Sequence, residues 1–178
     1  MMKKYSISIP LSGEVYRHAK TCQKKIYDSM SIKSTWTHNA EPHINLISGS
    51  TNDIDNIVNS IKKFKLKNNK SCELLGLGVL LTPDPLIYMR FTNSVFLREL
   101  RFSLFNETLP LWSDLTNTVK DDIWMPKSTL AYKDFALNDL SKALISLNGI
   151  KFQSSMEISE LCLIDFTDHE HEIKRISL

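Results

Sequence analysis

The sequence lacks a long apolar segment, any paired cysteines and a strong excess of charge of one sign. In its 178 residues, 22 Lys and Arg are offset by 20 Asp and Glu, which leaves a formal net charge of +2. This balance predicts no strong nonspecific affinity for nucleic acid, although a local basic patch can still supply one. No stretch is apolar over the roughly 20 residues that a membrane-spanning helix needs, and residues 1–7 lack the apolar run of a signal peptide. We therefore expect a cytoplasmic protein without a membrane-spanning segment.

Cysteine is scarce as well, and the cysteines lie far apart in the chain. Cys22, Cys72 and Cys162 stand among apolar neighbours, and no Cys-x-x-Cys pair occurs. The odd number and wide spacing give no support to a thiol redox site or to a zinc site built on cysteines. We interpret all of them as reduced, buried residues of an intracellular protein.

A chain of this length normally forms one domain with a sizeable core. The apolar periodicity predicts a half-buried strand at 4–9, further strands at 73–81, 86–91, 156–166 and 173–178, and helices from 12, over 54–64, from 94 and over 138–149. A turn with two prolines at 82–85 joins two of these strands into a hairpin. The mixture of helices and antiparallel-looking strands predicts an α+β fold.

Two short stretches of the chain are similar to one another. Residues 42–46 read Pro-His-Ile-Asn-Leu, and residues 126–130 read Pro-Lys-Ser-Thr-Leu. Because side chains alternate along a strand, His43 and Asn45 are expected to share one face, as are Lys127 and Thr129. Each copy is followed by an amphipathic helix, which suggests an internal duplication around a central polar groove. Two unrelated edge strands that begin with Pro are the alternative.

With these motifs the chain resembles the 2H phosphoesterase superfamily, the group of 2′-5′ RNA ligase-like proteins and cyclic phosphodiesterases. Members carry two His-x-Thr/Ser motifs on strands that face each other across a cleft. The resemblance implies a single domain over 1–178, with two pseudo-symmetric lobes of mainly antiparallel sheet, outer helices and a central cleft. His43 and Thr129 match the family pattern, whereas Asn45 replaces the first Thr/Ser and Lys127 replaces the second His.

The resemblance also implies metal-independent phosphodiester chemistry, in which one imidazole takes a proton, a second gives one, and hydroxyls hold the phosphate. A lysine, with an ordinary pKa of about 10.4, is a poor base, but it can stabilise phosphate charge, or donate a proton if burial lowers its pKa. We therefore assign His43 as base or acid, and Lys127 as a phosphate clamp or acid. Asn45 and Thr129 are expected to bind nonbridging oxygens. The expected reaction opens a 2′,3′-cyclic phosphate, or cleaves a 2′-5′ or cyclic oligonucleotide linkage.

Two other classes of function stay open. A catalytically degenerate member would bind a nucleotide or RNA in the same cleft without turnover, because a fixed cation and an amide suit holding phosphate. A purely structural or protein-binding domain would leave the paired polar motifs unexplained. For an enzyme or a degenerate binder alike, the expected partner is an RNA end, an oligonucleotide or a cyclic nucleotide. We expect a monomer that uses no metal, no organic cofactor and no membrane.

Aromatic side chains near the groove are candidates for binding a base, because stacking tolerates any base. Alternation in the strand 86–91 predicts that Tyr88 and Arg90 face outward, which makes them the first candidates. Trp36, Trp124 and Tyr132 come next. For each aromatic residue a place in the core or at its rim is the alternative, and it is the usual role of Trp and Tyr.

Two polar segments have simpler interpretations. The lysine-rich run at 62–70 follows a predicted helix, where a solvated face is the usual outcome and RNA contact is the alternative. Residues 168–172 read Asp-His-Glu-His-Glu, which could pair two imidazoles on a metal. No third ligand is identifiable, so we expect a solvated turn there.

Overall fold

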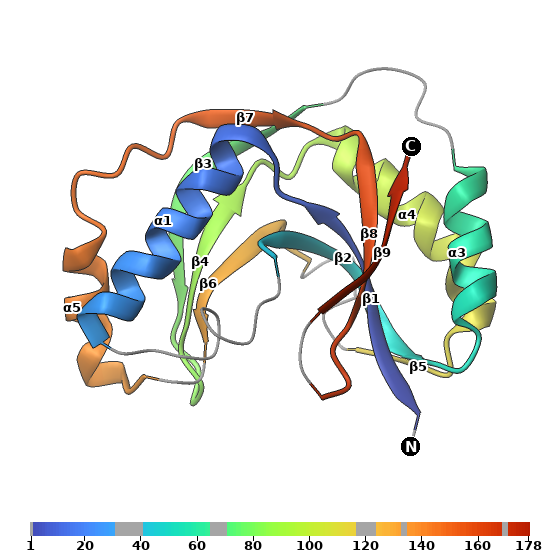
Figure 1. Cartoon of the computed structure of the whole chain (residues 1–178), viewed down its shortest axis with the longest axis horizontal. Helices are drawn as coiled ribbons and strands as arrows, with labels where there is room; N and C mark the ends of the chain where they lie inside the picture. Colours follow the sequence, from blue (N-terminus) through green and yellow to red (C-terminus); the bar gives the residue numbers. More distant parts are fainter. Residues whose placement is uncertain (1, 31–40, 65–70, 117–123, 133–134, 169–170) are drawn as a thin grey trace.

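The computed structural model describes residues 2–30, 41–64, 71–116, 124–132, 135–168 and 171–178. The chain forms two lobes side by side (Figure 1). In chain order the elements are β1 (Lys3–Pro10), α1 (Gly13–Met30), β2 (His43–Thr51), α3 (Ile54–Lys63), β3 (Ser71–Leu80), β4 (Leu86–Phe91), α4 (Val95–Thr108), the 3₁₀ turn η1 (Leu109–Leu111), β5 (Asp114–Leu115), β6 (Lys127–Tyr132), the 3₁₀ turn η3 (Leu137–Asp139), α5 (Leu140–Ser146), β7 (Ser154–Glu157), β8 (Glu160–Asp165) and β9 (His171–Ser177).

The strands divide into two sheets, one in each lobe. The first sheet has the order β5-β2-β1-β8-β9 and the second the order β6-β4-β3-β7. Every pairing among the described strands is antiparallel. The two motif strands, β2 and β6, belong to different sheets and contact each other where the lobes meet. The predicted α+β fold of two antiparallel lobes is confirmed.

Helices flank both sheets, and α1 packs in the lobe opposite to the strand that precedes it. It follows β1 of the first sheet but packs against α5, β6 and β7 of the second (Figure 1). Its predicted apolar stripe, with Val15, Ala19 and Ile26, is buried in this contact region. Helices α3 and α4 pack with the first sheet. The chain therefore passes from one lobe to the other within its first 30 residues.

The central strand β1 is buried more completely than its alternation predicts. Its apolar side chains are buried, but Ser6 and Ser8 are buried as well. The two serine hydroxyls satisfy each other through a hydrogen bond of 3.1 Å. The prediction of a half-buried strand is wrong, because the side chains on both faces of this central strand are buried.

Other predicted elements agree with the structure except at some boundaries. The helix predicted from residue 94 is confirmed, and the Ser94 hydroxyl caps it by accepting a hydrogen bond from the Leu97 amide. The single strand predicted at 156–166 is wrong, because β7 pairs with β3 in the second sheet whereas β8 pairs with β1 in the first. Helix α5 begins at Leu140, since 137–139 form the turn η3.

Candidate active site

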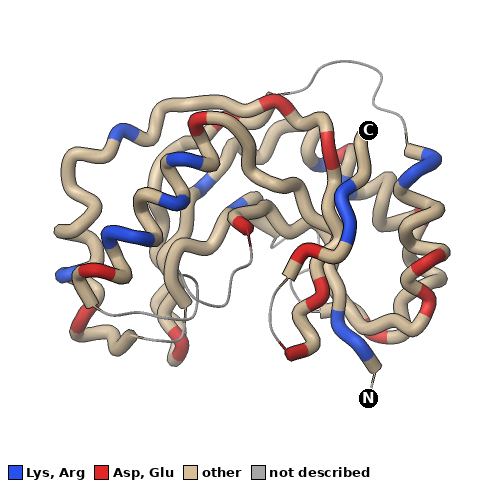
Figure 2. Tube along the Cα trace, in the orientation of Figure 1, with Lys and Arg blue, Asp and Glu red and all other residues tan. Residues whose placement is uncertain are grey.

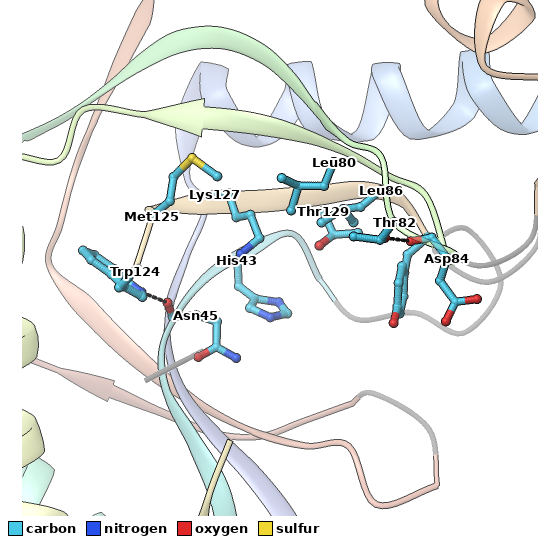
Figure 3. Close-up of a pocket in the computed structure, with 11 residues that line it drawn as sticks. His43, Asn45, Leu80, Thr82, Asp84, Leu86, Trp124, Met125, Lys127 and Thr129 are labelled. Atoms are coloured by element: carbon cyan, nitrogen blue, oxygen red, sulfur yellow. Dashed lines mark hydrogen bonds between the residues drawn. The ribbon is translucent and has the colours of Figure 1, made fainter. Parts of the chain in front are cut away.

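A cleft of about 410 Å³ lies where the two motif strands meet (Figure 3). It is lined by His43, Asn45, Leu80, Thr82, Asp84, Leu86, Trp124, Met125, Lys127, Thr129 and Tyr132. All four polar residues of the predicted motifs are in this set, although they come from strands of different sheets. The volume falls in the range of roughly 300–1,000 Å³ that small-molecule sites occupy.

A β-bulge occurs at the same place in both motif strands. The register of β1 and β2 passes from Ile47 to Asn45 and skips Leu46, and the register of β4 and β6 passes from Ala131 to Thr129 and skips Leu130. Each leucine is buried, and each follows directly after the second polar residue of its motif. A bulge bends a strand and redirects its side chains, and it often stands next to an active site. The matching bulges support the internal duplication that the sequence repeat suggests.

The backbone carbonyl of Glu41 orients the ring of His43. Nδ1 of His43 lies 2.9 Å from the Glu41 carbonyl oxygen, which can only accept a hydrogen bond. Nδ1 therefore carries the proton of the neutral ring, and Nε2 is left with its lone pair. Glu41 is itself tied to α1, because a hydrogen bond from Tyr16 to its carboxylate raises the pKa of that tyrosine. His43 is thus prepared to accept a proton at Nε2.

The ammonium group of Lys127 faces the cleft without a countercharge from the described residues. Its side chain is partly buried, and this desolvation lowers the pKa of the ammonium below the ordinary lysine value. No residue that the structure describes forms an ion pair or a side-chain hydrogen bond with it. In Figure 3 the side chains of Lys127 and His43 approach each other from β6 and β2. An unneutralised cation in a half-closed cleft favours the binding of an anion.

Asn45 and Thr129 combine available side chains with anchored carbonyls. Within the described ranges, neither the Asn45 amide nor the Thr129 hydroxyl has a hydrogen-bond partner. The Trp124 indole donates to the Asn45 carbonyl oxygen at 3.1 Å, and the Gln23 amide donates to the Thr129 carbonyl oxygen at 3.4 Å. Both backbones are therefore fixed just before their bulges, while both side chains stay available to a ligand.

Trp124 and Arg101 together hold the first motif strand in place. The Arg101 guanidinium lies 5.0 Å from the centroid of the Trp124 ring, and its Nε donates to the Leu46 carbonyl oxygen at 3.0 Å. Trp124 precedes β6, so its bond to Asn45 crosses from one lobe to the other. Trp124 therefore lines the cleft with a ring that is fixed by its contacts with Asn45 and Arg101.

Sequence reasoning did not identify Gln23 or Arg101 as parts of this site. Both are buried, and Gln23 is only 3% exposed. Each interrupts the buried stripe of its helix, between Cys22 and Ile26 in α1 and between Leu100 and Leu104 in α4. A polar residue inside an apolar stripe was the available signal, because a buried polar group needs a partner.

The predicted base-binding residues are placed differently from one another. Tyr132 is 39% exposed and lines the cleft, as does Trp124. Arg90 is exposed opposite Lys127 in the register of β4 and β6 but does not line the cleft. Trp36 lies outside the described residues.

The expectation that Tyr88 faces outward is wrong, since only 5% of it is exposed. Its ring occupies the space above Gly78 on the neighbouring strand, where an added Cβ would come within 2.2 Å of the ring. Its hydroxyl donates to the Met125 sulfur at 3.7 Å. Because Gly78 has no side chain, the ring can lie flat across β3 instead of standing away from the sheet.

The remaining sequence predictions concern cysteines, metals and membranes. Cys22, Cys72 and Cys162 are free and buried, as predicted, and burial raises the pKa of each thiol to about 12. Among the described residues, no group of three or more His, Cys, Asp or Glu is placed to hold a metal ion. The described helices include none with the length and apolar character to cross a membrane. Residues 65–70 of the lysine run and 169–170 of the histidine segment lie outside the described residues.

The fold of this chain matches known structures, whereas its sequence matches no family model and no curated protein. Among solved structures, TT0787 of Thermus thermophilus has a TM-score of 0.70 and 13% identity, over 98% of this chain and 97% of that chain. Apo LigT of E. coli matches with a TM-score of 0.67 and 13% identity, over 99% of this chain and 98% of that chain. Usb1 of Kluyveromyces marxianus matches with a TM-score of 0.54 and 9% identity, over 99% of this chain and 98% of that chain.

All three are members of the 2H phosphoesterase superfamily. This chain has the 2H phosphoesterase fold. The match extends over nearly the whole chain, so the resemblance drawn from two short motifs is confirmed for the architecture. At identities this low, the chemistry must be argued from the side chains that this 2H fold places in its cleft. Among the described side chains that line the cleft there is one histidine, where the family pattern has two.

Proposed function

We propose that this protein is a metal-independent phosphodiesterase that acts on 2′,3′-cyclic phosphate, 2′-5′ or cyclic oligonucleotide linkages. The observation that carries the proposal is the meeting of an imidazole and an ammonium from different lobes in one cleft, where no described carboxylate pairs with the ammonium. The Asn45 amide and the Thr129 hydroxyl lie on the same two strands. These four groups are what a phosphodiester needs for proton transfer and for charge stabilisation.

In the proposed reaction, Nε2 of His43 removes a proton from the attacking water as its oxygen bonds to phosphorus. Negative charge that develops on the nonbridging oxygens is stabilised by the Lys127 ammonium, the Asn45 amide and the Thr129 hydroxyl. The bond from phosphorus to the ribose oxygen breaks, and that oxygen takes a proton from Nζ of Lys127. Burial lowers the pKa of the Lys127 ammonium toward neutral pH, which makes the ammonium a stronger acid and favours this donation.

Ligands seen in structures with this fold support a nucleotide as the substrate. E. coli LigT has been solved in complex with 3′-AMP, at 14% identity and a TM-score of 0.66 to this chain. The Usb1 structure contains uridine monophosphate. Charge on the described part of this chain is not segregated between the two lobes. Lys and Arg occur in both lobes together with Asp and Glu, and neither lobe carries one sign of charge (Figure 2). Ligand recognition is therefore assigned to the cleft rather than to a broad electrostatic field.

A second candidate is a catalytically degenerate protein that binds a nucleotide or RNA in the same cleft. The observation that favours it is Lys127 itself, since an ammonium holds phosphate well but replaces an imidazole poorly in proton transfer. In that case Asn45, Thr129 and Lys127 bind the phosphate, and no bond is broken.

Incubation in EDTA with 2′,3′-cyclic-phosphate-ended oligonucleotides, 2′-5′ dinucleotides and cyclic dinucleotides separates these two functions. Chromatographic detection of product in the wild type, and its loss by about 10²–10⁴-fold in His43→Ala, supports the enzyme. His18→Ala is the matched control, because His18 lies on α1 outside the cleft and should leave the rate unchanged. Binding without product supports the degenerate protein, and Lys127→His should then introduce turnover. If the protein neither binds these compounds nor releases product from them, both functions are contradicted.

A further inference from the structure

One end of the cleft is apolar, and the strand registers explain why. Leu80 pairs with Leu86 between β3 and β4, and Leu86 pairs with Tyr132 between β4 and β6. Residues paired in this way share a face of a sheet, so the three side chains lie next to one another across three strands. We name this group, Leu80, Leu86 and Tyr132, the apolar shelf. Leu80 and Tyr132 are 37% and 39% exposed, which leaves an open surface of the kind on which a base stacks.

A carboxylate stands beside the apolar shelf, in the turn between β3 and β4. Asp84 lines the cleft, and in Figure 3 it lies on the far side of His43 from Trp124. The Thr82 hydroxyl donates a hydrogen bond to the Asp84 backbone carbonyl, and prolines at 83 and 85 restrict the backbone on both sides. None of the described residues forms an ion pair or hydrogen bond with the Asp84 carboxylate. The backbone of Asp84 is therefore held in place, and its exposed carboxylate oxygens are available to a ligand.

The two ends of the cleft carry opposite charge, which orients any nucleotide bound there. The ammonium of Lys127 attracts a phosphate, whereas the Asp84 carboxylate repels one. A ligand that places its phosphate near His43 and Lys127 must direct an uncharged group toward the apolar shelf and Asp84. For a nucleotide, that group is the base.

We propose that the apolar shelf and Asp84 form a base subsite that selects guanine, an inference that rests on the proposed function of the cleft. Guanine alone among the common bases presents two adjacent donors, N1–H and the 2-amino group, which can bond both oxygens of one carboxylate. Adenine and cytosine place a ring-nitrogen acceptor beside their amino group, and uracil has a single N–H between two carbonyl groups. A bound base displaces water from the Asp84 carboxylate. A base that cannot donate hydrogen bonds in return leaves the carboxylate oxygens unsatisfied, so such a base is bound less tightly.

The test compares kcat/KM of the full-length protein for the 2′,3′-cyclic phosphates of guanosine, adenosine, cytidine and uridine. We expect the wild type to prefer guanosine by roughly 5- to 150-fold, the discrimination that one bidentate base contact supplies. In Asp84→Asn, which keeps the size of the side chain, this preference should fall to near unity while the rate on uridine changes little. Asp114→Asn is the matched control, because Asp114 is an exposed residue on β5 that lies outside the cleft.

A second variant separates stacking from base selection. Tyr132→Leu should raise KM for all four nucleotides by a similar factor, because stacking on a ring does not depend on which base is bound. A wild type that treats the four nucleotides alike, or a guanosine preference that Asp84→Asn leaves intact, overturns the subsite but not the proposed function. If no nucleotide is turned over, calorimetric affinities for the four nucleoside 3′-monophosphates decide the guanine preference independently of catalysis, and equal affinities overturn it.

Discussion

Lys127 places a positive charge on a half-buried side chain that no described carboxylate neutralises. Such a group costs stability, because burial disfavours the charged form while no ion pair offsets the cost. The same feature serves a phosphate, which supplies the missing negative charge when it binds. Loss of stability and gain of function are therefore expected to have one physical origin at this residue.

We expect Lys127→Met to raise Tm near neutral pH and to lower turnover by about 10²–10³-fold, the usual effect of losing one transition-state donor. The folded-state pKa of Lys127 lies below its unfolded value, so the unfolded state binds more protons between the two. Wild-type stability therefore rises with pH through that window, as the penalty for the buried charge disappears. The Tm gain of Lys127→Met should shrink accordingly as the pH approaches the ordinary lysine pKa.

Lys142→Met is the matched control for this experiment, because Lys142 is an exposed lysine whose ion pair with Asp139 lies at the surface. Surface pairs of this kind contribute little to stability. An equal Tm gain in both variants, or a gain in Lys127→Met that persists at high pH, contradicts the assignment of a desolvated charge to Lys127.

Among the secondary-structure elements, the motif strands depend on contacts that come from elsewhere in the chain. Trp124, which precedes β6, donates to the Asn45 carbonyl on β2 and thereby joins the lobes across the cleft. We expect Trp124→Phe, which keeps an aromatic ring but loses the donor, to lower the free energy of unfolding by about 0.5–1.5 kcal/mol. Turnover should fall as well, because Asn45 loses its anchor. Trp112→Phe is the comparison, since its indole bonds within the first lobe, to Thr108. Similar activity in the two variants would contradict a positioning role for Trp124.

Gly78 tests the packing beneath the cleft. A Cβ at this position would come within 2.2 Å of the Tyr88 ring, so Gly78→Ala should lower the free energy of unfolding by about 1–3 kcal/mol, the usual range for overpacking. Replacing Tyr88 with Val removes the ring, so the same Gly78→Ala change should cost less in that background. Urea denaturation of the single and double variants measures both effects. If Gly78→Ala costs as much stability in the Tyr88→Val background as in the wild type, the clash is not the cause.

The sequence was sufficient where a property depends on neighbouring residues alone. His43, Asn45, Lys127 and Thr129 could be grouped because two short motifs repeat, and the helix that starts at residue 94 could be predicted from the apolar spacing that follows. The bulges at Leu46 and Leu130 could not, since a bulge is defined by the pairing of strands distant in sequence. Tyr88 shows a second limit. Alternation assigns a side chain to a face, but its burial here depends on Gly78 in another strand.

At the scale of the whole molecule, the chain crosses between the lobes repeatedly. The first sheet takes strands from residues 3–10, 43–51, 114–115, 160–165 and 171–177, and the second sheet takes those in between. Helix α1 adds a further crossing, because it packs in the lobe opposite to β1 and β2. No single cut of the chain therefore yields an intact lobe, and we propose that the two lobes form one domain.

We expect this arrangement to produce one cooperative unfolding transition. Far-UV circular dichroism reports on both sheets, whereas the fluorescence of Trp112 and Trp124, measured in a Trp36→Phe background, reports on the first lobe and on the contact between the lobes. The two signals should give the same urea midpoint, as expected for two-state behaviour. Separate midpoints would show that one lobe unfolds before the other.

The pairing of β1 with β8 also has a consequence for synthesis on the ribosome. β1 is made long before its neighbour β8, which spans residues 160–165, and β7 at 154–157 is needed to complete the other sheet. A nascent chain thus holds apolar strands without their partners while the intervening residues are translated. Both sheets are completed almost together, after these late residues have left the exit tunnel. The protein should consequently depend on ribosome-associated chaperones during synthesis more than a protein whose halves are assembled one after the other.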